Sequence, residues 1–293
     1  MRIWLNAARP RTLPAAVAPV LVGTAVAWRQ ADGLPRLGGF LAAMIASILI
    51  QIGTNLANDY SDARRGTDST DRLGPVRITA AGLATPSRVL WAAWIAFGLS
   101  IIAGLYLTWL AGPVILVIGA LSITAGALYT GGPKPYGYSG LGEVFVFLFF
   151  GLIAVNGSYF VQTEALDWGA FGLSVTVGLL ATAILVVNNI RDIDSDRRAG
   201  KMTLAARFGR QWTRKLFRAL MSLALVVLLL TVAFDRSLDG ALFGLVAIPF
   251  GLRALRAVEN RTDGPSLNRA LADVGVCLGV FALAASLGLV LVG

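Results

Sequence analysis

The chain has 293 residues, of which 56% are hydrophobic and only 14% charged, and its mean hydropathy is +0.72. This composition excludes an ordinary soluble domain, in which about a quarter of the residues are charged, and it predicts an all-α, polytopic membrane protein. The absence of histidine excludes histidine general bases and histidine-ligated zinc, and a single cysteine excludes an intrachain disulfide.

Nine apolar segments are predicted to cross the membrane, and we interpret residues 1–293 as one integral-membrane domain. The segments lie near residues 13–28, 37–57, 89–110, 113–130, 142–161, 168–188, 217–234, 240–255 and 272–292. Of the 25 Lys and Arg residues, 22 lie in loops and helix ends on the same side of the membrane as the N-terminus. The other three, Arg29, Arg36 and Arg236, lie on the opposite side. Because cytoplasmic loops are rich in Lys and Arg, this asymmetry predicts a cytoplasmic N-terminus in the inner (plasma) membrane. It also explains the net charge of +9 without nucleic-acid binding.

The segment before the first span carries Arg9 and Arg11 between two prolines, Pro10 and Pro14. It predicts an interfacial stretch that leads into a proline-bearing helix. Either arginine could contact a phosphate, although anchoring at the membrane surface is the simpler interpretation.

Polar side chains follow the second apolar segment at its inner end. If the helix continues, Asn55, Asn58, Asp59 and Asp62 fall at i, i+3, i+4 and i+7 and share one face. Carboxylates at membrane depth are costly and commonly functional. We therefore predict a polar site here. The alternative is that these residues only mark where the helix leaves the bilayer.

A mixed-charge segment, residues 59–88, comes next. It contains Arg64 and Arg65, and glycines at 66 and 74 with Pro75 are expected to break the helix. Mixed charge beside a carboxylate stripe is what a metal–phosphate site requires, whereas the simpler interpretation is a solvated loop.

The middle of the chain, residues 89–133, is free of charge and is predicted to form two antiparallel helices joined at Gly112 and Pro113. A Gly/Pro-broken turn over residues 129–138 carries only one charge, Lys134. Glu143 begins the next span and precedes four phenylalanines. They either pack against lipid or line a cavity, where their faces would stabilise a cation or cradle an isoprenoid tail.

A second polar motif ends the sixth apolar segment. Asn188, Asp192 and Asp196 repeat at i, i+4 and i+8, and Arg191 and Lys201 belong to the most basic loop, which begins there. Two motifs of the same composition favour one shared polar site over two separate helix ends.

Opposed carboxylates and carboxamides supply the hard oxygen ligands that Mg²⁺ prefers, usually together with substrate phosphates. Two such motifs suit two Mg²⁺ ions bridged by a diphosphate. The predicted metal ligands are Asn55, Asn58, Asp59, Asp62, Asn188, Asp192 and Asp196. The predicted diphosphate-binding cations are Arg64, Arg65, Lys134, Arg191 and Lys201, and the predicted catalytic residues are Asp62, Asp192, Asp196 and Lys134.

The motifs over residues 58–62 and 192–196 resemble the two Asp-rich motifs of the UbiA superfamily of intramembrane prenyltransferases. The wider sequence is similar to the 1,4-dihydroxy-2-naphthoate polyprenyltransferase (MenA-type) branch, over residues 8–14, 55–68, 72–83, 131–151 and 188–209. The resemblance implies nine helices around a central cavity open to the cytoplasmic side. It also implies Mg²⁺, a polyprenyl diphosphate donor, and a naphthoate acceptor that loses CO₂ in menaquinone biosynthesis.

The same resemblance implies metal–diphosphate roles for Asn58, Asp62, Asp192 and Asp196, and a phosphate role for Lys134. The chain departs from the superfamily where a third acid often follows four residues after the equivalent of Asp62. Gly66 stands there, and Asp68 is a candidate substitute.

Other functions stay open from the sequence. Within the superfamily the acceptor could be 4-hydroxybenzoate, homogentisate or a tetrapyrrole. Outside it, intramembrane acids also occur in ion-coupled transporters. A transporter would be expected to place such acids near the membrane midplane.

Overall fold

The computed structural model describes residues 2–30, 36–66, 73–74 and 77–292. Asp68, the candidate third acid, lies outside these residues. Over the described ranges the secondary structure is entirely helical, without a strand, so the predicted all-α class is confirmed.

The described helices alternate long spans with short connecting turns. In chain order they are α1 (Arg2–Ala7), η1 (Pro10–Thr12), α2 (Pro14–Gln30), α3 (Leu37–Arg65), α4 (Pro86–Ala111), α5 (Val114–Leu128), η2 (Tyr136–Tyr138), α6 (Gly142–Val146), η3 (Phe147–Ile153), α7 (Ala154–Thr163), α8 (Trp168–Arg191), α9 (Ile193–Arg198), α10 (Leu204–Phe234), η4 (Arg236–Ala247), α11 (Ile248–Asn260) and α12 (Gly264–Leu291).

Each of the nine predicted spans overlaps a helix, but the helices differ in their capacity to cross a membrane. In the described chain, seven are long and apolar enough: α3, α4, α6–η3–α7, α8, α10, η4–α11 and α12. An eighth arises if α2 is joined to the segment before it across a bend of 51°. Helix α5, with 15 residues, is shorter than a usual span. The chain is a multi-pass membrane protein, and the number nine stays a prediction.

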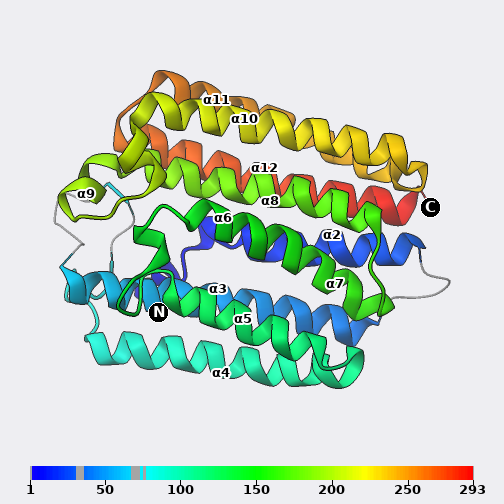
Figure 1. Cartoon of the computed structure of the whole chain (residues 1–293), viewed down its shortest axis with the longest axis horizontal. Coiled ribbons are helices and arrows are strands. Elements are labelled where there is room, and N and C mark those ends of the chain that lie inside the picture. The colour runs from blue at the N-terminus through cyan, green and yellow to red at the C-terminus, as the bar shows by residue number, and fades with distance from the viewer. Residues whose placement is uncertain (1, 31–35, 67–72, 75–76, 293) are drawn as a thin grey trace.

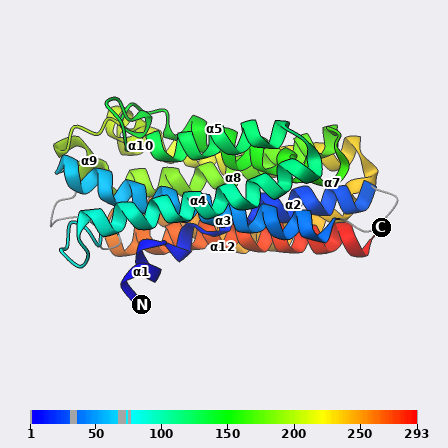
Figure 2. The same cartoon turned by 90° about the horizontal axis from the view of Figure 1, so that it is seen from below.

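The long helices run side by side along one direction, as Figure 1 shows, with α10 and α11 on one flank and α3, α4 and α5 on the other. Helices α2, α8 and α12 lie between these flanks, and α1 projects from the bundle (Figure 2). Helix α3 and helix α8 end at the same end of the bundle, beside α9 (Figure 1). We call this the motif end.

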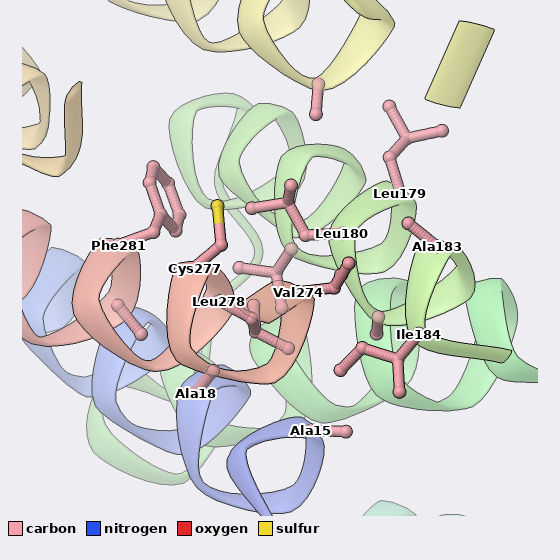
Figure 3. Close-up of a cluster of buried hydrophobic side chains, with 14 of the residues drawn as sticks. Ala15, Ala18, Leu179, Leu180, Ala183, Ile184, Val274, Cys277, Leu278 and Phe281 are labelled. Atoms are coloured by element: carbon pink, nitrogen blue, oxygen red, sulfur yellow. The ribbon is translucent and has the colours of Figure 1, made fainter. Parts of the chain in front are cut away.

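The main hydrophobic core lies where α8 and α12 meet α2. Figure 3 shows Leu180 and Ile184 of α8 beside Val274 and Leu278 of α12, with Ala18 of α2 below them. Because Ala18 is small, α2 can approach the larger side chains closely. The single cysteine, Cys277, lies in the same core and is 4% exposed.

A glycine pair brings the π-helix η3 against α8. A Cβ placed on Gly151 would lie 2.6 Å from the Cα of Gly178 and 2.8 Å from the carbonyl oxygen of Ser174. Both atoms belong to the backbone and cannot turn aside. The contact therefore fixes the position of η3, which carries part of the cavity wall described below. Such π-helical segments occur frequently at functional sites.

Replacing Gly151 tests this contact. We expect Gly151→Ala to destabilise the protein by about 1–3 kcal/mol, because overpacking forces backbone atoms apart. The measurement is the thermal unfolding midpoint in detergent. Gly98→Ala is the matched control, because a Cβ at this exposed helical glycine meets nothing within 4 Å. An unfolding midpoint for Gly151→Ala that equals the control's would contradict the contact.

Candidate functional site

A cavity of about 570 Å³ occupies the middle of the bundle. Its wall at the motif end is polar and includes Asn58, Asp62, Arg77, Asn188 and Lys201. Away from that end the wall is mostly apolar and comes from α3, α4, α5, η3 and α7. A charged end that continues into an apolar chamber suits a ligand with a polar head and a long apolar tail.

Helix α3 continues past the apolar segment as predicted and ends at Gly66, which has a left-handed φ of 67°. Asn55, Asn58, Asp59 and Asp62 are all buried, with exposures of 5% or less. Three of them line the cavity, whereas Asp59 is directed to a neighbouring loop. The four predicted residues are therefore buried together on α3, but three of them face the cavity and the fourth, Asp59, holds a loop.

Asp62 is held by a cation and a phenol. The guanidinium of Arg77 contacts its Oδ2 at 2.7 Å, and the hydroxyl of Tyr138 donates to its Oδ1 at 2.8 Å. Arg77 follows α3 in the mixed-charge segment, and Tyr138 belongs to the turn after α5. A carboxylate on a membrane helix is thereby neutralised by loops that fold back over the motif end.

Asp59 anchors one of these loops. Its Oδ2 accepts a hydrogen bond from the backbone N–H of Ile78, and its Oδ1 accepts one from Thr79, both at 3.0 Å. Arg77 lies immediately before these two residues, so Asp59 fixes the backbone from which Arg77 reaches Asp62. A metal role for Asp59 stays a prediction.

Asn55 and Asn58 make different contacts. The Nδ2 of Asn55 donates to the carbonyl oxygen of Ala8 at 3.0 Å, which ties α3 to the N-terminal segment. The Oδ1 of Asn58 accepts from the hydroxyl of Thr130 at 2.8 Å, which ties α3 to the end of α5. Both asparagines also line the cavity.

The second motif does not follow one helical stripe, because α8 ends at Arg191 and α9 begins at Ile193. Asp192 occupies the break with φ −97° and ψ 9°. Asn188 reaches the cavity wall, whereas Asp192 and Asp196 lie buried behind it. The break turns the last carboxylate of the motif away from the α8 axis.

Arg191 and Asp192 form a buried ion pair. The Nε and one terminal nitrogen of Arg191 bind the two Asp192 oxygens at 2.8 and 2.6 Å. The guanidinium also donates to Asn188 and to Asn268, each at 2.8 Å. Arg191, predicted to bind diphosphate, thus holds three oxygen-bearing side chains of the motif end in place. Its role toward a diphosphate stays a prediction.

Asp196 lies beside Lys201 and Thr203. The Lys201 ammonium is 3.9 Å from its Oδ1, and the Thr203 hydroxyl is 3.5 Å from its Oδ2. Lys201 also lies 5.4 Å from the centre of the Tyr138 ring, and Arg65 approaches the same ring at 5.7 Å. Tyr138 therefore connects the two motifs, because it hydrogen-bonds Asp62 and also contacts the cation beside Asp196.

The remaining predicted cations lie at the surface of the motif end. Arg64 is exposed and donates to the hydroxyl of Tyr60 at 3.0 Å. Arg65 is exposed and donates to the carbonyl oxygen of Gly132. Lys134 is exposed on the turn after α5. None of the three is on the cavity wall in the part of the chain that the structure describes.

Sequence reasoning missed two residues of the site, Arg77 and Tyr138, and favoured a membrane-anchoring role over a phosphate contact for a third, Arg9. Arg77 and Tyr138 lie in loops, and no helical period predicts which loop residue folds inward. The mixed charge of the first loop was the only signal for Arg77. Arg9 was identified as an interfacial residue, whereas in the structure it lines the cavity.

An aromatic ladder forms one wall of the cavity. Its members Tyr129, Tyr136, Phe145 and Phe149 follow one another at ring-centre distances of 5.4, 4.0 and 6.0 Å. Phe147 instead contacts Gly178 of α8. Burial raises the pKa of Tyr136, whose hydroxyl donates to the carbonyl oxygen of Ala125 at 2.9 Å, so this phenol stays protonated. The predicted alternative in which phenylalanines line a cavity holds for Phe145, Phe149 and Phe150.

The oxygen donors fit Mg²⁺ only together with a substrate. In the described residues, no group of three or more acidic, histidine or cysteine side chains lies close enough to hold a metal ion. Mg²⁺ commonly takes one or two carboxylates and completes its octahedron with water and phosphate oxygens. Asp62, Asn58 and Asn188, which share one cavity wall, supply such a partial set.

Comparisons with known proteins agree with this architecture. Residues 16–284 match the UbiA prenyltransferase family. The chain belongs to that family. It is 44% identical to the 1,4-dihydroxy-2-naphthoate octaprenyltransferase of Mycobacterium leprae, covering 99% of this chain and 97% of the relative. It is 42% identical to the Escherichia coli enzyme of the same name, covering 89% and 86%.

A solved UbiA homologue from Archaeoglobus fulgidus, bound to GPP and Mg²⁺, has the same fold. It superposes with a TM-score of 0.73 over 98% of this chain and 99% of the homologue, at 14% sequence identity. The same homologue has also been solved with Cd²⁺. That homologue therefore binds divalent metals.

Asp59→Asn tests the anchoring role of Asp59. An amide has only one acceptor oxygen, so one loop N–H loses its partner, which costs about 1–3 kcal/mol. We expect a lower unfolding midpoint and reduced turnover at every Mg²⁺ concentration, with an unchanged Mg²⁺ concentration at half-maximal turnover. If half-maximal turnover instead requires a higher Mg²⁺ concentration than in the wild type, Asp59 binds metal.

Proposed function

We propose that this UbiA-family protein transfers a polyprenyl group from polyprenyl diphosphate to 1,4-dihydroxy-2-naphthoate. Diphosphate and CO₂ leave, and the product is demethylmenaquinol, the reduced form of demethylmenaquinone, an intermediate of menaquinone biosynthesis. The observation that carries this proposal is the cavity, which joins carboxylate and amide donors at the motif end to an apolar, aromatic chamber. The names of the similar enzymes support the same acceptor.

The diphosphate would bind at the motif end with Mg²⁺. Asn58 and Asp62 of α3 and, from the second motif, Asn188 and Asp196 are the proposed ligands, and Asp192 holds Arg191 beside Asn188. When bound, Mg²⁺ neutralises the diphosphate and so makes it a better leaving group. To bind the metal, Asp196 must turn toward the cavity from its present position, where its Oδ1 lies 3.9 Å from the Lys201 ammonium.

The protein's own cations share the charge of the departing diphosphate. Arg77 and Lys201 line the cavity and contact Asp62 and Asp196, respectively. Lys134 lies on the neighbouring turn, where it would need to fold over the diphosphate to contribute. Arginine binds phosphate oxygens through a planar fork, whereas lysine acts as a point charge.

The apolar chamber protects the reacting carbon. Departure of diphosphate leaves positive charge on the allylic carbon of the donor, and water must be excluded until the acceptor ring attacks. The faces of Tyr136, Phe145 and Phe149 line this chamber and can stabilise the positive charge. The new carbon–carbon bond uses an electron pair of the ring, and loss of CO₂ returns a pair to it.

The donor's tail needs more room than the cavity alone gives. Several wall residues of α4 and α5 are exposed: Ile101, Leu116, Ala120 and Thr124. We expect the chamber to open between these helices, so that a long isoprenoid can extend into the bilayer. We place the motif end at the cytoplasmic side of the inner membrane, from the distribution of Lys and Arg.

The direct test is turnover by the purified protein in detergent or vesicles. With Mg²⁺ and a polyprenyl diphosphate, we expect 1,4-dihydroxy-2-naphthoate to yield a prenylated, decarboxylated product by mass spectrometry, with equimolar diphosphate. We expect 4-hydroxybenzoate to react at least about tenfold more slowly, because the wider naphthalene fills more of the apolar wall. Equal turnover of 4-hydroxybenzoate would refute the acceptor. Absence of diphosphate release with every aromatic acceptor would refute the enzyme class.

A double-mutant series tests whether the two motifs act on one diphosphate. We expect Asp62→Asn and Asp196→Asn each to lower kcat by about 100-fold or more, since each removes charge that the leaving group requires. The double mutant should be scarcely worse than the worse single mutant, as for residues that act as a unit. Asp194→Asn, on the same short helix but exposed, is the matched control. If the fold-loss of kcat in the double mutant equals the product of the two single-mutant losses, the motifs serve separate steps.

A further inference from the structure

A second hollow lies between α10 and α11, on the flank of the bundle away from α3, α4 and α5 (Figure 1). It has a volume of about 170 Å³, and no residue that lines it also lines the cavity. Its floor comes from α8 and α12, where Figure 3 shows Cys277 and Phe281 pointing away from α2. Its sides come from α10, η4 and α11. We call it the flank groove.

The lining of the flank groove is almost entirely apolar. Its polar members are Thr176, whose hydroxyl donates within its own helix to the carbonyl oxygen of Gly172 at 3.5 Å, and Ser222. Ser222, Leu225 and Leu252 are exposed, so the groove opens to the outside of the bundle. In a membrane that surrounding is lipid, and a narrow apolar groove suits a hydrocarbon chain.

Basic residues continue the two sides of the groove toward the motif end. On α10, Arg214 and Arg218 precede Leu225 by eleven and seven residues and share its helical face. On α11, Arg256 follows Leu252 by four residues and so lies one turn beyond it. Membrane topology requires basic residues at this end of the bundle, but it does not require them to be aligned with a groove.

These cations outnumber the acids beside them. Residues 204–222 and 248–261 contain eight Lys and Arg residues and one acid, Glu259. Arg218 directs its Nε and one terminal nitrogen at the same Glu259 oxygen, at 2.8 and 2.6 Å. Arg214 donates instead to two backbone carbonyl oxygens at the end of α11. Positive charge therefore remains at the mouth of the groove.

Two guanidinium groups at this mouth are placed to receive an anion. The Arg218 side chain is 58% exposed, and within the described chain its second terminal nitrogen makes no hydrogen bond. Arg256 is exposed, and its side chain has no ion pair or hydrogen bond with any residue that the structure describes. A guanidinium binds phosphate oxygens through its planar fork of N–H donors.

We propose that the flank groove binds an anionic phospholipid, with an acyl chain between α10 and α11 and the headgroup phosphate on Arg218 and Arg256. A phospholipid carries its charge and its hydrocarbon in the order in which the protein presents cations and groove. Anionic lipids are attracted to basic clusters at the cytoplasmic surface of a membrane. The site is separate from the cavity, so this inference does not rest on the proposed function.

Binding of two phospholipids to the purified protein in detergent, measured by native mass spectrometry, tests the headgroup contact. The probes are phosphatidylglycerol and phosphatidylcholine with identical acyl chains. We expect the wild type to prefer phosphatidylglycerol. The double variant Arg218→Gln/Arg256→Gln should weaken phosphatidylglycerol binding about 10- to 30-fold, the loss expected for two cations at a membrane surface, and should abolish the preference.

The matched control is Arg11→Gln/Arg88→Gln, which removes the same charge from two exposed arginines outside the groove. We expect it to change phosphatidylglycerol binding less than about threefold. If both double variants weaken binding equally, only the overall charge attracts the lipid, and the proposal is wrong. If the Arg218→Gln/Arg256→Gln protein fails to fold, Arg256→Gln alone, which breaks no ion pair, should give a smaller loss of the same selectivity.

A second pair of variants tests the acyl chain. Ser222→Phe places a ring over the groove, whereas Leu223→Phe changes an exposed neighbour that does not line it. We expect Ser222→Phe to weaken phosphatidylglycerol binding at least about fivefold, because the ring occupies the space of the chain, and Leu223→Phe to leave it unchanged. Equal binding by the two variants would overturn the groove assignment and leave a headgroup contact at the surface.

Three further outcomes are decisive. Equal wild-type binding of both phospholipids, unaffected by Arg218→Gln/Arg256→Gln, would show an adventitious lipid only. A dimer that forms in place of the lipid complex and is lost in Ser222→Phe would show that the groove holds a second copy of this chain. Selective phosphatidylglycerol binding by a protein that transfers no prenyl group would refute the proposed function and leave this inference intact.

Discussion

The structure depends on keeping carboxylates charged and buried at the ends of two membrane helices. An unpaired carboxylate in a medium of low dielectric constant costs several kcal/mol, so each must have a partner. Asp62 has Arg77 and Tyr138, and Asp192 has Arg191. The loops of the motif end are therefore part of the site. These loops fold back over the helix ends, which brings the partner side chains Arg77 and Tyr138 into contact with Asp62.

Pairing of this kind is suited to a substrate that carries both charge and metal. A guanidinium released from a carboxylate can bind phosphate, and the carboxylate can then bind Mg²⁺. The buried pairs thus neutralise these carboxylates while no substrate is bound, and the proposed function requires them to exchange partners when it binds. The apolar chamber needs no charged pairs, because its aromatic side chains are uncharged and pack against one another.

Two kinds of close approach maintain the chamber. Gly151 and Gly178 let η3 meet α8 backbone to backbone, which fixes the aromatic ladder. Gly275 lets α12 meet the turn at Arg9. In a bilayer, helices gain little from the hydrophobic effect between themselves, so contacts between small residues supply much of the packing energy. The same contacts determine where the functional side chains lie.

The sequence by itself determined the class of the protein, its apolar segments and the two polar motifs. Helical periodicity placed Asn58 and Asp62 on one buried face, because α3 continues unbroken to Arg65. The sequence left open whether the phenylalanines after Glu143 pack against lipid or line a cavity, and in the structure Phe145 and Phe149, four residues apart, are both on the wall.

Only the tertiary structure decided which polar residues meet. The break at Asp192 ends the second stripe, and no local preference in the sequence predicts it. The interpretation of Asp59 and of the segment before α2 changed because each is held by a distant part of the chain: Asp59 accepts from a loop backbone, and Ala8 accepts from Asn55 of α3. Local periodicity describes one helix at a time, whereas the burial of a charge is settled by whichever segment folds back to pair with it.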